Sequence, residues 1–338
     1  MLTRGNNLRR IILISWLVLV YGSWLVLVMI RGEFQAIINH WPISAAMALG
    51  SYFAGSTPMG GGTIGFPVLT LLLGETPGLG RDFSFAIQSV GMVSASIFIF
   101  CLSHPVAFRF LRWAILGSTL GTPLGILFIS PHISGFLIQI FFAIFWAGFG
   151  VLHLWKLNEF SSYSDHPKPH EKLELVYGLG TGFFSSLLIS SILGVGVDLA
   201  LYAVLVLVFR TDLRLAIPTS VILMAYTSVL GTLTQSLTLG MSPAVYGYWL
   251  AAAPVVAIGA PLGAIIVKKM GRKPTMWIVS FLCLLQFFWT MSKEWERLQM
   301  TGVLLSLLSV AGFFGLFYVF YRVGKKLVND PAHERKLQ

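Results

Sequence analysis

Long apolar segments recur along the chain and dominate its pattern of hydrophobic and polar positions. A helix needs about 20 apolar residues to cross the hydrocarbon core of a bilayer. The segments that approach or exceed this length are each predicted to be a full membrane-spanning helix: residues 11–30, 83–103, 113–129, 133–154, 215–239, 241–267, 275–291 and 301–321. The pattern therefore predicts an all-α membrane protein, built as a polytopic helical bundle.

Two further apolar regions, residues 43–74 and 177–209, are interrupted near their middles. The first contains three consecutive glycines, Gly60 to Gly62, followed by Pro67, and the second contains Gly194 and Gly196. Glycine costs a helix about 1 kcal/mol relative to alanine, and proline removes a backbone donor. A break at membrane depth is tolerated only where protein or a water-filled cavity surrounds it. We predict that each region forms a hairpin of two helical arms joined by a break.

A tight helix crossing is the structural alternative for the first interruption, because glycine lets two backbones touch. That alternative does not need prolines beside three glycines, whereas broken segments of this kind mark the binding sites of transporters. The sequence therefore favours a functional break over a packing motif.

Basic clusters set the expected orientation of the chain. They lie at residues 4–10, 268–273 and 322–326, and the positive-inside rule places all three in the cytoplasm. Both termini are then cytoplasmic, the polar loop 156–175 is cytoplasmic, the first hairpin opens outward and the second opens inward. The expected location is the cell (inner or plasma) membrane, as a multi-pass protein.

This topology divides the chain into two halves of opposite orientation. The expected parts are a cytoplasmic N-terminal tail (1–10), a first transmembrane repeat (11–130), a second transmembrane repeat (131–270), an extra helix pair (271–322) and a cytoplasmic C-terminal tail (323–338). A matching motif supports the duplication, because Gly121-Thr-Pro-Leu-Gly125 resembles Gly259-Ala-Pro-Leu-Gly263. The bundle is thus predicted to hold two inverted-topology repeats, each with a broken-helix hairpin.

Composition agrees with this class and excludes others. The chain is 56% hydrophobic and 11% charged, whereas soluble domains carry about 25% charged residues. Its net charge of +10 is explained by basic loops, so no nucleic-acid partner is expected. Cys101 and Cys283 are predicted to be inert. His104, His132 and His153 are predicted to be interfacial, and their spacing does not fit zinc or iron. No metal, cofactor or catalytic residue is expected.

The two breaks supply the candidate binding residues. A short helix that begins after a break presents unpaired N–H groups and the positive end of its dipole, which bind anions. Polar residues just after each hairpin are added because they occupy similar places in the two halves. The candidate substrate-binding residues are Thr57, Gly60, Gly61, Gly62, Thr63, Gln88, Ser89, Ser191, Gly194, Gly196, Thr219 and Ser220. The alternative for each hydroxyl is a bond to a carbonyl of its own helix.

Asp198 is the acidic residue that lies deepest in an apolar run. An ionisable group at membrane depth is a functional-site hypothesis by default, and Asp198 is the candidate for proton coupling. Two structural alternatives stay open: Asp198 caps a helix beside Gly196, or it forms an ion pair with Arg210.

The run from Gly60 to Gly62 with Pro67, and the later segment Ala216-Ile-Pro-Thr219-Ser220, resemble the TauE/SafE family of sulfite exporters. The resemblance covers roughly residues 40–320. It implies ion-gradient-driven transport of sulfite, an organosulfonate or a related organic acid. The second half departs from the family pattern, because Gly194-Val-Gly196-Val-Asp198 replaces a full triple glycine, and the first half has Gln88-Ser89 in place of a Thr-Ser pair.

The expected function is therefore secondary transport, with export as the expected direction, of a small anion by alternating access. The expected partners are this anionic substrate and the lipid bilayer, and a homo-oligomer is left open. A non-transporting scaffold subunit is the first alternative, since residues 156–174 could dock a partner. An intramembrane enzyme is the second, although it would need a paired acid, a Ser/His pair or a metal set.

Overall fold

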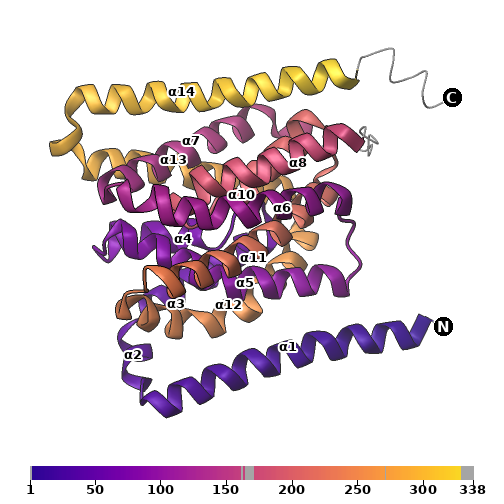
Figure 1. The fold of residues 1–338 in the computed structure, drawn as a ribbon, viewed down its shortest axis with the longest axis vertical. Helices are drawn as coiled ribbons and strands as arrows, with labels where there is room; N and C mark the ends of the chain where they lie inside the picture. Colours follow the sequence, from indigo (N-terminus) through magenta and orange to yellow (C-terminus); the bar gives the residue numbers. More distant parts are fainter. Residues whose placement is uncertain (1, 161–162, 164–170, 271, 329–338) are drawn as a thin grey trace.

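The computed structural model describes residues 2–160, 163, 171–270 and 272–328, and the helices in these residues form one bundle (Figure 1). Nine helices within this part of the chain are long and apolar enough to cross a membrane, which confirms the predicted all-α polytopic membrane protein. The helices are α1 (Leu2–Arg31), α2 (Phe34–Asn39), α3 (Trp41–Ser56), α4 (Gly62–Pro67), α5 (Pro77–Cys101), α6 (Phe108–Leu124), α7 (Gly135–Phe160), α8 (Glu171–Ser185), α9 (Ser191–Leu193), α10 (Val197–Ala203), α11 (Leu213–Thr238), α12 (Pro243–Met270), α13 (Arg272–Lys293) and α14 (Trp295–Val328).

Short π-helical or 3₁₀ turns extend several of these helices. They are η1 (Val68–Leu72), η2 (Gly125–Ile129), η3 (Ser130–His132), η4 (Ser186–Ser190) and η5 (Val204–Val208), of which η3 is the 3₁₀ turn. The turn η1 begins directly after Pro67, and η2 begins two residues after Pro123. Proline lacks the N–H that an α-helix needs, so the hydrogen-bond register slips to the wider π spacing at these places.

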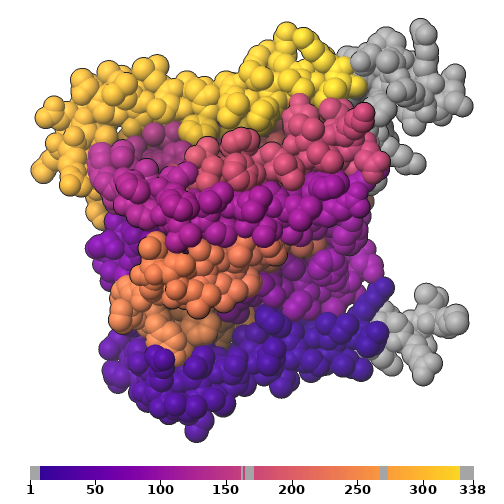
Figure 2. All heavy atoms as spheres, viewed as in Figure 1, coloured from indigo at the N-terminus to yellow at the C-terminus, as the bar shows by residue number. Residues whose placement is uncertain are grey.

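The outer helices α1 and α14 lie on opposite flanks of the bundle, and the interrupted helices lie between them (Figures 1 and 2). The start of α1 and the end of α14 are at the same end of the bundle (Figure 1). This arrangement agrees with two termini on one side of a membrane. Their assignment to the cytoplasm stays a prediction.

Both predicted hairpins are present. In the first, α3 ends at Ser56 and the second arm, α4 with η1, begins at Gly62. In the second, α8, η4 and α9 end at Leu193 and the second arm, α10 with η5, begins at Val197. The second arms, Gly62–Leu72 and Val197–Val208, are shorter than the spanning helices. Because α5, α6 and α7 each cross the bundle between the hairpins, the two hairpins open at opposite ends.

The two halves exchange contacts. Helix α3 of the first hairpin packs along α12, while α8 of the second hairpin packs along α6, and α5 packs along α11. This reciprocal pairing supports the inverted repeat, which stays a prediction.

Glycines of the matched motifs make these two exchanged contacts. A Cβ at Gly121 would overlap the Phe183 carbonyl of α8, and a Cβ at Gly263 would overlap the Tyr52 carbonyl of α3. Glycine is needed at both positions because the backbones of the paired helices touch there. The motif match in the sequence thus corresponds to equivalent helix contacts.

Several predicted boundaries were wrong. Helix α5 begins at Pro77 rather than at residue 83, because Thr76 caps it (Leu79 N to Thr76 Oγ1, 3.3 Å) and proline suits the first turn. The ends of the predicted loop 156–175 are helical, in α7 and α8, and residues 161–162 and 164–170 of that loop lie outside the described residues. Helix α1 begins at Leu2 and α14 continues to Val328, with residues 329–338 outside the described part, and the division into cytoplasmic tails and repeats stays a prediction.

The prediction that His153 is interfacial was also wrong. His153 is fully buried on α7, and its Nε2 lies 3.0 Å from the Tyr202 hydroxyl of α10. Its Nδ1 lies 3.1 Å from the carbonyl of Phe149. The surrounding sequence is hydrophobic and gave no sign that His153 and Tyr202 would pair. Their hydrogen bond connects α7 to the second hairpin.

We predict that Gly121→Ala lowers the stability of the folded protein, because the new methyl group would push α6 away from α8. Overpacking of this kind costs about 1–3 kcal/mol. Gly180→Ala on α8 is the control, since a Cβ there meets nothing within 4 Å and alanine favours a helix. Thermal unfolding of both variants in detergent, followed by size-exclusion chromatography, checks this expectation. Equal melting temperatures for the two variants would contradict it.

Candidate functional site

The two helix breaks lie in the interior of the described bundle. All residues from 56 to 63 and from 191 to 199 are buried. Backbone polar groups at such a place must find partners within the protein. Both breaks make contacts with α5, and they therefore lie close together.

In the first break, glycine residues carry the chain from α3 into α4. The amide of Thr63 donates to the carbonyl of Gly60 at 3.0 Å, which closes the first turn. A Cβ at Gly60 would overlap the carboxamide of Gln88, and a Cβ at Gly62 would lie 2.8 Å from Cβ of Ser84. Glycines are needed here because side chains of α5 pack directly on this backbone. Gly61 caps α4 between them.

In the second break, both glycines adopt backbone angles that other residues avoid. Gly194 has φ 74° and Gly196 has φ 108°, in the left-handed region that favours glycine. A Cβ at Gly194 would also overlap the carbonyl of Arg81 on α5. A Cβ at Gly196 would lie 3.0 Å from the Phe145 ring of α7. The break is therefore shaped both by its own turn and by α5.

Gln88 connects the two breaks. Its Nε2 donates to the carbonyl of Gly194 at 3.0 Å and to the carbonyl of Ser84 at 2.9 Å. Its Oε1 lies against Gly60 of the first break. Gln88 is 1% exposed, so these contacts are made away from water, where each is costly to lose. The sequence placed Gln88 among the candidates, and the structure places it at the junction.

Asp198 lies at the same junction. It is fully buried, and its Oδ1 accepts a hydrogen bond from Leu199 N at 2.9 Å. Backbone amides of Gly60 and Gly196 also face the carboxylate. Its Oδ2 lies 3.5 Å from the place that a Gly60 Cβ would take and has no hydrogen-bond partner within the described residues.

The two structural alternatives for Asp198 are now separated. The capping alternative is present in the structure, because Asp198 bonds to an amide in the first turn of α10. The ion pair with Arg210 is not formed, since the Nη2 of Arg210 lies 3.7 Å from the Glu159 carboxylate instead. Asp198 therefore lies beside the amides of both breaks without a basic side chain as partner.

Most hydroxyl groups among the candidate binding residues instead donate to a carbonyl of their own helix, which was the structural alternative. The bonds run from Thr57 to Phe53 (2.7 Å), from Ser89 to Ala86 (2.8 Å), from Ser191 to Leu187 (2.6 Å), from Thr219 to Leu215 (2.6 Å) and from Ser220 to Ile217 (2.9 Å). Intrahelical bonds of this type are the usual use of a buried hydroxyl group in a helix.

Two of these residues lie away from the junction. Ser89 lines a separate cavity of about 550 Å³, together with Arg31 and Tyr246. The Thr219 hydroxyl accepts a bond from the amide of Ala107 at 3.0 Å, just before α6. Adjacent helix positions point in different directions, so the pairs Gln88-Ser89 and Thr219-Ser220 do not act as units.

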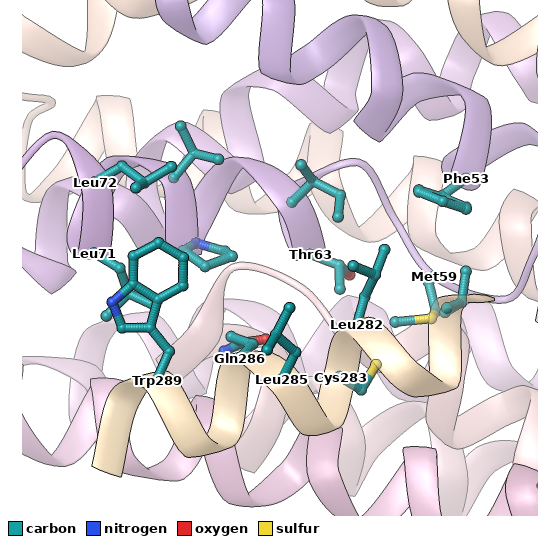
Figure 3. Close-up of a pocket in the computed structure, with 14 residues that line it drawn as sticks. Phe53, Met59, Thr63, Leu71, Leu72, Leu282, Cys283, Leu285, Gln286 and Trp289 are labelled. Atoms are coloured by element: carbon teal, nitrogen blue, oxygen red, sulfur yellow. The ribbon is translucent and has the colours of Figure 1, made fainter. Parts of the chain in front are cut away.

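Thr63 faces a different space, shown in Figure 3. This cavity of about 180 Å³ lies between the first hairpin and α13. Its lining is mainly apolar, and Gln286 and Thr63 point into it beside Leu282 and Trp289 (Figure 3). The hydroxyl of Thr63 has no hydrogen-bond partner in the described residues. A small anion would find too few donors there, so this cavity is not the candidate site.

Sequence reasoning missed Ser84. Its side chain packs against both breaks, since it lies 2.8 Å from the Cβ position of Gly62 and 2.9 Å from that of Gly194. Its hydroxyl donates to the carbonyl of Gly80 at 2.7 Å. Ser84 precedes Gln88 by four residues, and this spacing places both on one face of a helix. That four-residue spacing could have identified Ser84 from the sequence.

The junction is closed in this conformation. The cavity beside Gly61 and Gln88 measures about 10 Å³, which is roughly the space of one water molecule. A small oxyanion needs more room, so a solute can enter only if the two breaks separate.

We predict that Gln88→Ala loosens both breaks, because the carbonyl of Gly194 would lose its partner. An unsatisfied buried group costs about 1–3 kcal/mol, which corresponds to roughly 5- to 150-fold in an opening equilibrium. Hydrogen exchange measured by mass spectrometry should become faster at residues 194–199. Gln235→Ala is the control, because Gln235 bonds to Gly240 near the end of α11. Unchanged exchange at the breaks in a folded Gln88→Ala protein would refute the connecting role.

A comparison with known protein families matches residues 43–289 to the family described as sulfite exporter TauE/SafE. The match covers more than half of the chain and includes both breaks, Gln88 and Asp198. A search of curated proteins and a search of solved structures each returned no match. The chain therefore belongs to the TauE/SafE sulfite exporter family.

Proposed function

We propose that this protein is a secondary transporter that exports a small anion, such as sulfite, an organosulfonate or a related organic acid. Membership of a transporter family supports membrane transport as the general function. The substrate class and the direction are carried over from the family's description as sulfite exporters, and the anion site and the mechanism are inferred from the junction of the two breaks.

One observation carries the proposal: backbone amides of both breaks face the same negative group. Amides of Gly60 in the first break and of Gly196 and Leu199 in the second are directed at the Asp198 carboxylate. Backbone amides at helix starts favour a negative charge. A solute anion that reached this place would meet donors from both hairpins without a buried lysine or arginine.

Alternating access would move the hairpins apart at one end and then at the other. Their open ends face opposite ends of the bundle, and each second arm is short. The residues of both breaks are buried, which is what an occluded conformation on this pathway would require. Opening toward one side would break the contact between Gln88 and one of the two breaks.

The apolar cavity next to the first hairpin gives the short arm space to move. This cavity of about 180 Å³ lies between α13 and the arm formed by α4 and η1 (Figure 3). The apolar side chains that line the cavity can slide past one another, but Lys293 of α13 donates to the carbonyls of Thr70 and Leu71 in η1 at 2.8 and 3.1 Å, so a shift of the arm would have to break or carry along these bonds. We infer that the arm shifts into this space when the junction opens.

The expected setting is the cell membrane, with both termini in the cytoplasm and the extra helices α13 and α14 packed on α7. A non-transporting scaffold subunit and an intramembrane enzyme are the alternatives. An enzyme would lose activity when Asp198 is replaced but not when Gly61 is replaced, whereas a transporter would lose flux in both cases.

We predict solute flux in proteoliposomes that contain the purified protein. A panel of sulfite, thiosulfate, sulfonates and carboxylates would identify the substrate class. Gly60→Ala should reduce that flux about tenfold or more, because its methyl group would displace the Gln88 carboxamide. Gly180→Ala should transport like the natural protein. Absence of flux for the whole panel would overturn the proposal, and normal flux in Gly60→Ala would move the site elsewhere.

We also predict that filling the apolar cavity slows transport without unfolding the protein. Leu282→Trp places a larger side chain into the cavity, so the first hairpin arm would lose its space. Phe281→Trp on the same helix is the control, because Phe281 is 63% exposed on the outer face. Flux at saturating solute should fall for Leu282→Trp and stay unchanged for Phe281→Trp. Equal flux in the two variants would show that the arm does not use this cavity.

A further inference from the structure

Two buried oxygen atoms at the junction lack hydrogen-bond donors. They are Gln88 Oε1 and Asp198 Oδ2, and neither has a partner within the described residues. Both lie beside the first break, since the Gly60 Cβ position overlaps Gln88 Oε1 and lies 3.5 Å from Asp198 Oδ2. A carboxylate oxygen and an amide oxygen are both acceptors. Two acceptors facing one small space are unfavourable unless a donor lies between them, either a water molecule or a proton carried by one of the two groups.

The orientation of the Gln88 amide is determined by its other contacts. Its nitrogen lies 2.9 Å from the Ser84 carbonyl and 3.0 Å from the Gly194 carbonyl. A rotated amide would bring its oxygen against these two carbonyl oxygens and would lose both hydrogen bonds. The oxygen must therefore face Gly60 and Asp198, so rotation of the amide cannot supply the missing donor.

We propose that Asp198 and Gln88 form a proton-binding site, in which the protonated Asp198 donates from Oδ2 to Gln88 Oε1. One proton then satisfies both atoms. It also connects α10 of the second hairpin to α5, whose Gln88 in turn holds Gly194 and contacts Gly60. The bound proton thereby connects the two breaks through Gln88.

A metal cation fits this place less well than a proton. Hard cations take about six or more oxygen ligands, and the junction offers two oxygens that lack donors. Asp198 is fully buried and Gln88 is 1% exposed, which leaves no exposed surface there for an ion with bound water. A proton needs neither more ligands nor more space.

No charged side chain near Asp198 takes over the role of the proton in the described residues. The interactions that act on its carboxyl group come from backbone amides. On α5, Arg81 is paired with Asp82 at 2.7 Å. On α7, His153 is bonded to Tyr202 of α10. Helices α8 and α11 also pack on α10, and their ionisable residues are Glu171, Lys172, Glu174, Tyr177, Arg214 and Tyr226. Glu174 is paired with Arg109, and Glu171 with Arg112.

The proton site has a consequence for transport, which rests on the proposed function. An ionised Asp198 competes with a solute anion for the same backbone amides, whereas a protonated Asp198 leaves them free for the solute. Proton and anion are therefore expected to bind together. The affinity for the anion should fall as the pH rises through the titration of Asp198, because the carboxylate then replaces the solute.

Infrared spectroscopy of the protein in lipid nanodiscs tests the proton site without any solute. At neutral pH the natural protein should show a carboxylic-acid C=O band that is lost in Asp198→Asn. The band should shift in Gln88→Leu, because its hydrogen-bond partner is removed. Asp82→Asn is the matched control, since Asp82 is a buried acid on α5 that is paired with Arg81, and it should leave this band unchanged.

Asp198→Asn retains a donor toward Gln88, so it should fold and serve as a permanently neutral form. If Gln88→Leu fails to fold, Gln88→Asn replaces it, because its shorter side chain draws the oxygen away and also shifts the band. If the spectrum contains no carboxylic-acid band that is lost in Asp198→Asn, the proton site is overturned. If the band is present but does not shift in the Gln88 variant, the pairing of Asp198 with Gln88 is overturned. Since this test uses no solute, its failure leaves the flux prediction intact, and a failed flux assay leaves the proton site intact.

Discussion

An interrupted helix inside a bilayer must find hydrogen-bond partners within the protein, and this constraint explains the centre of the molecule. The second break leaves the carbonyl of Gly194 without a helical partner, and the Gln88 amide of α5 supplies one at 3.0 Å. The same amide group lies on Gly60 of the first break. One side chain therefore stabilises two breaks that lie far apart in the sequence, and neither break can change shape without affecting the other.

The halves of the bundle are held together by contacts between backbones. Glycines of α6 lie against carbonyls of α8, and glycines of α12 lie against α3. In each case a helix of one half supports the first arm of the hairpin in the other half. In these contacts one backbone packs directly on another, with no long side chain between them. The first arms are therefore held close to the helices that support them. The second arm α10 with η5 is held by a contact of the same kind, because Gly324 of α14 lies against the carbonyl of Leu207, whereas α4 with η1 borders the apolar cavity and is the arm suited to move.

Much of this arrangement could be predicted from the sequence, and the parts that could not have clear physical reasons. Three glycines beside prolines in an apolar run predicted the first hairpin, Gly194 and Gly196 in a second apolar run predicted the other, and the matched glycine motifs marked the paired helices. The direction of each side chain is different, because it depends on tertiary packing. Ser89 follows Gln88 directly, yet it faces another cavity, and Ser84 was overlooked although it touches both breaks. The proximity of Asp198 to Gly60 arises only when the two hairpins meet.

The position of Asp198 changes how the anion site is understood. Amides of both breaks could bind a solute directly, but in this conformation they face a carboxylate that belongs to the protein. An ionised Asp198 keeps these donors occupied when no solute is present, whereas a protonated Asp198 donates to Gln88 and no longer competes for them. A solute must then displace that group or arrive together with a proton that neutralises it. Proton binding at Asp198 and anion binding at the breaks would thus be linked through competition for the same amides, and no separate signal between distant sites is required.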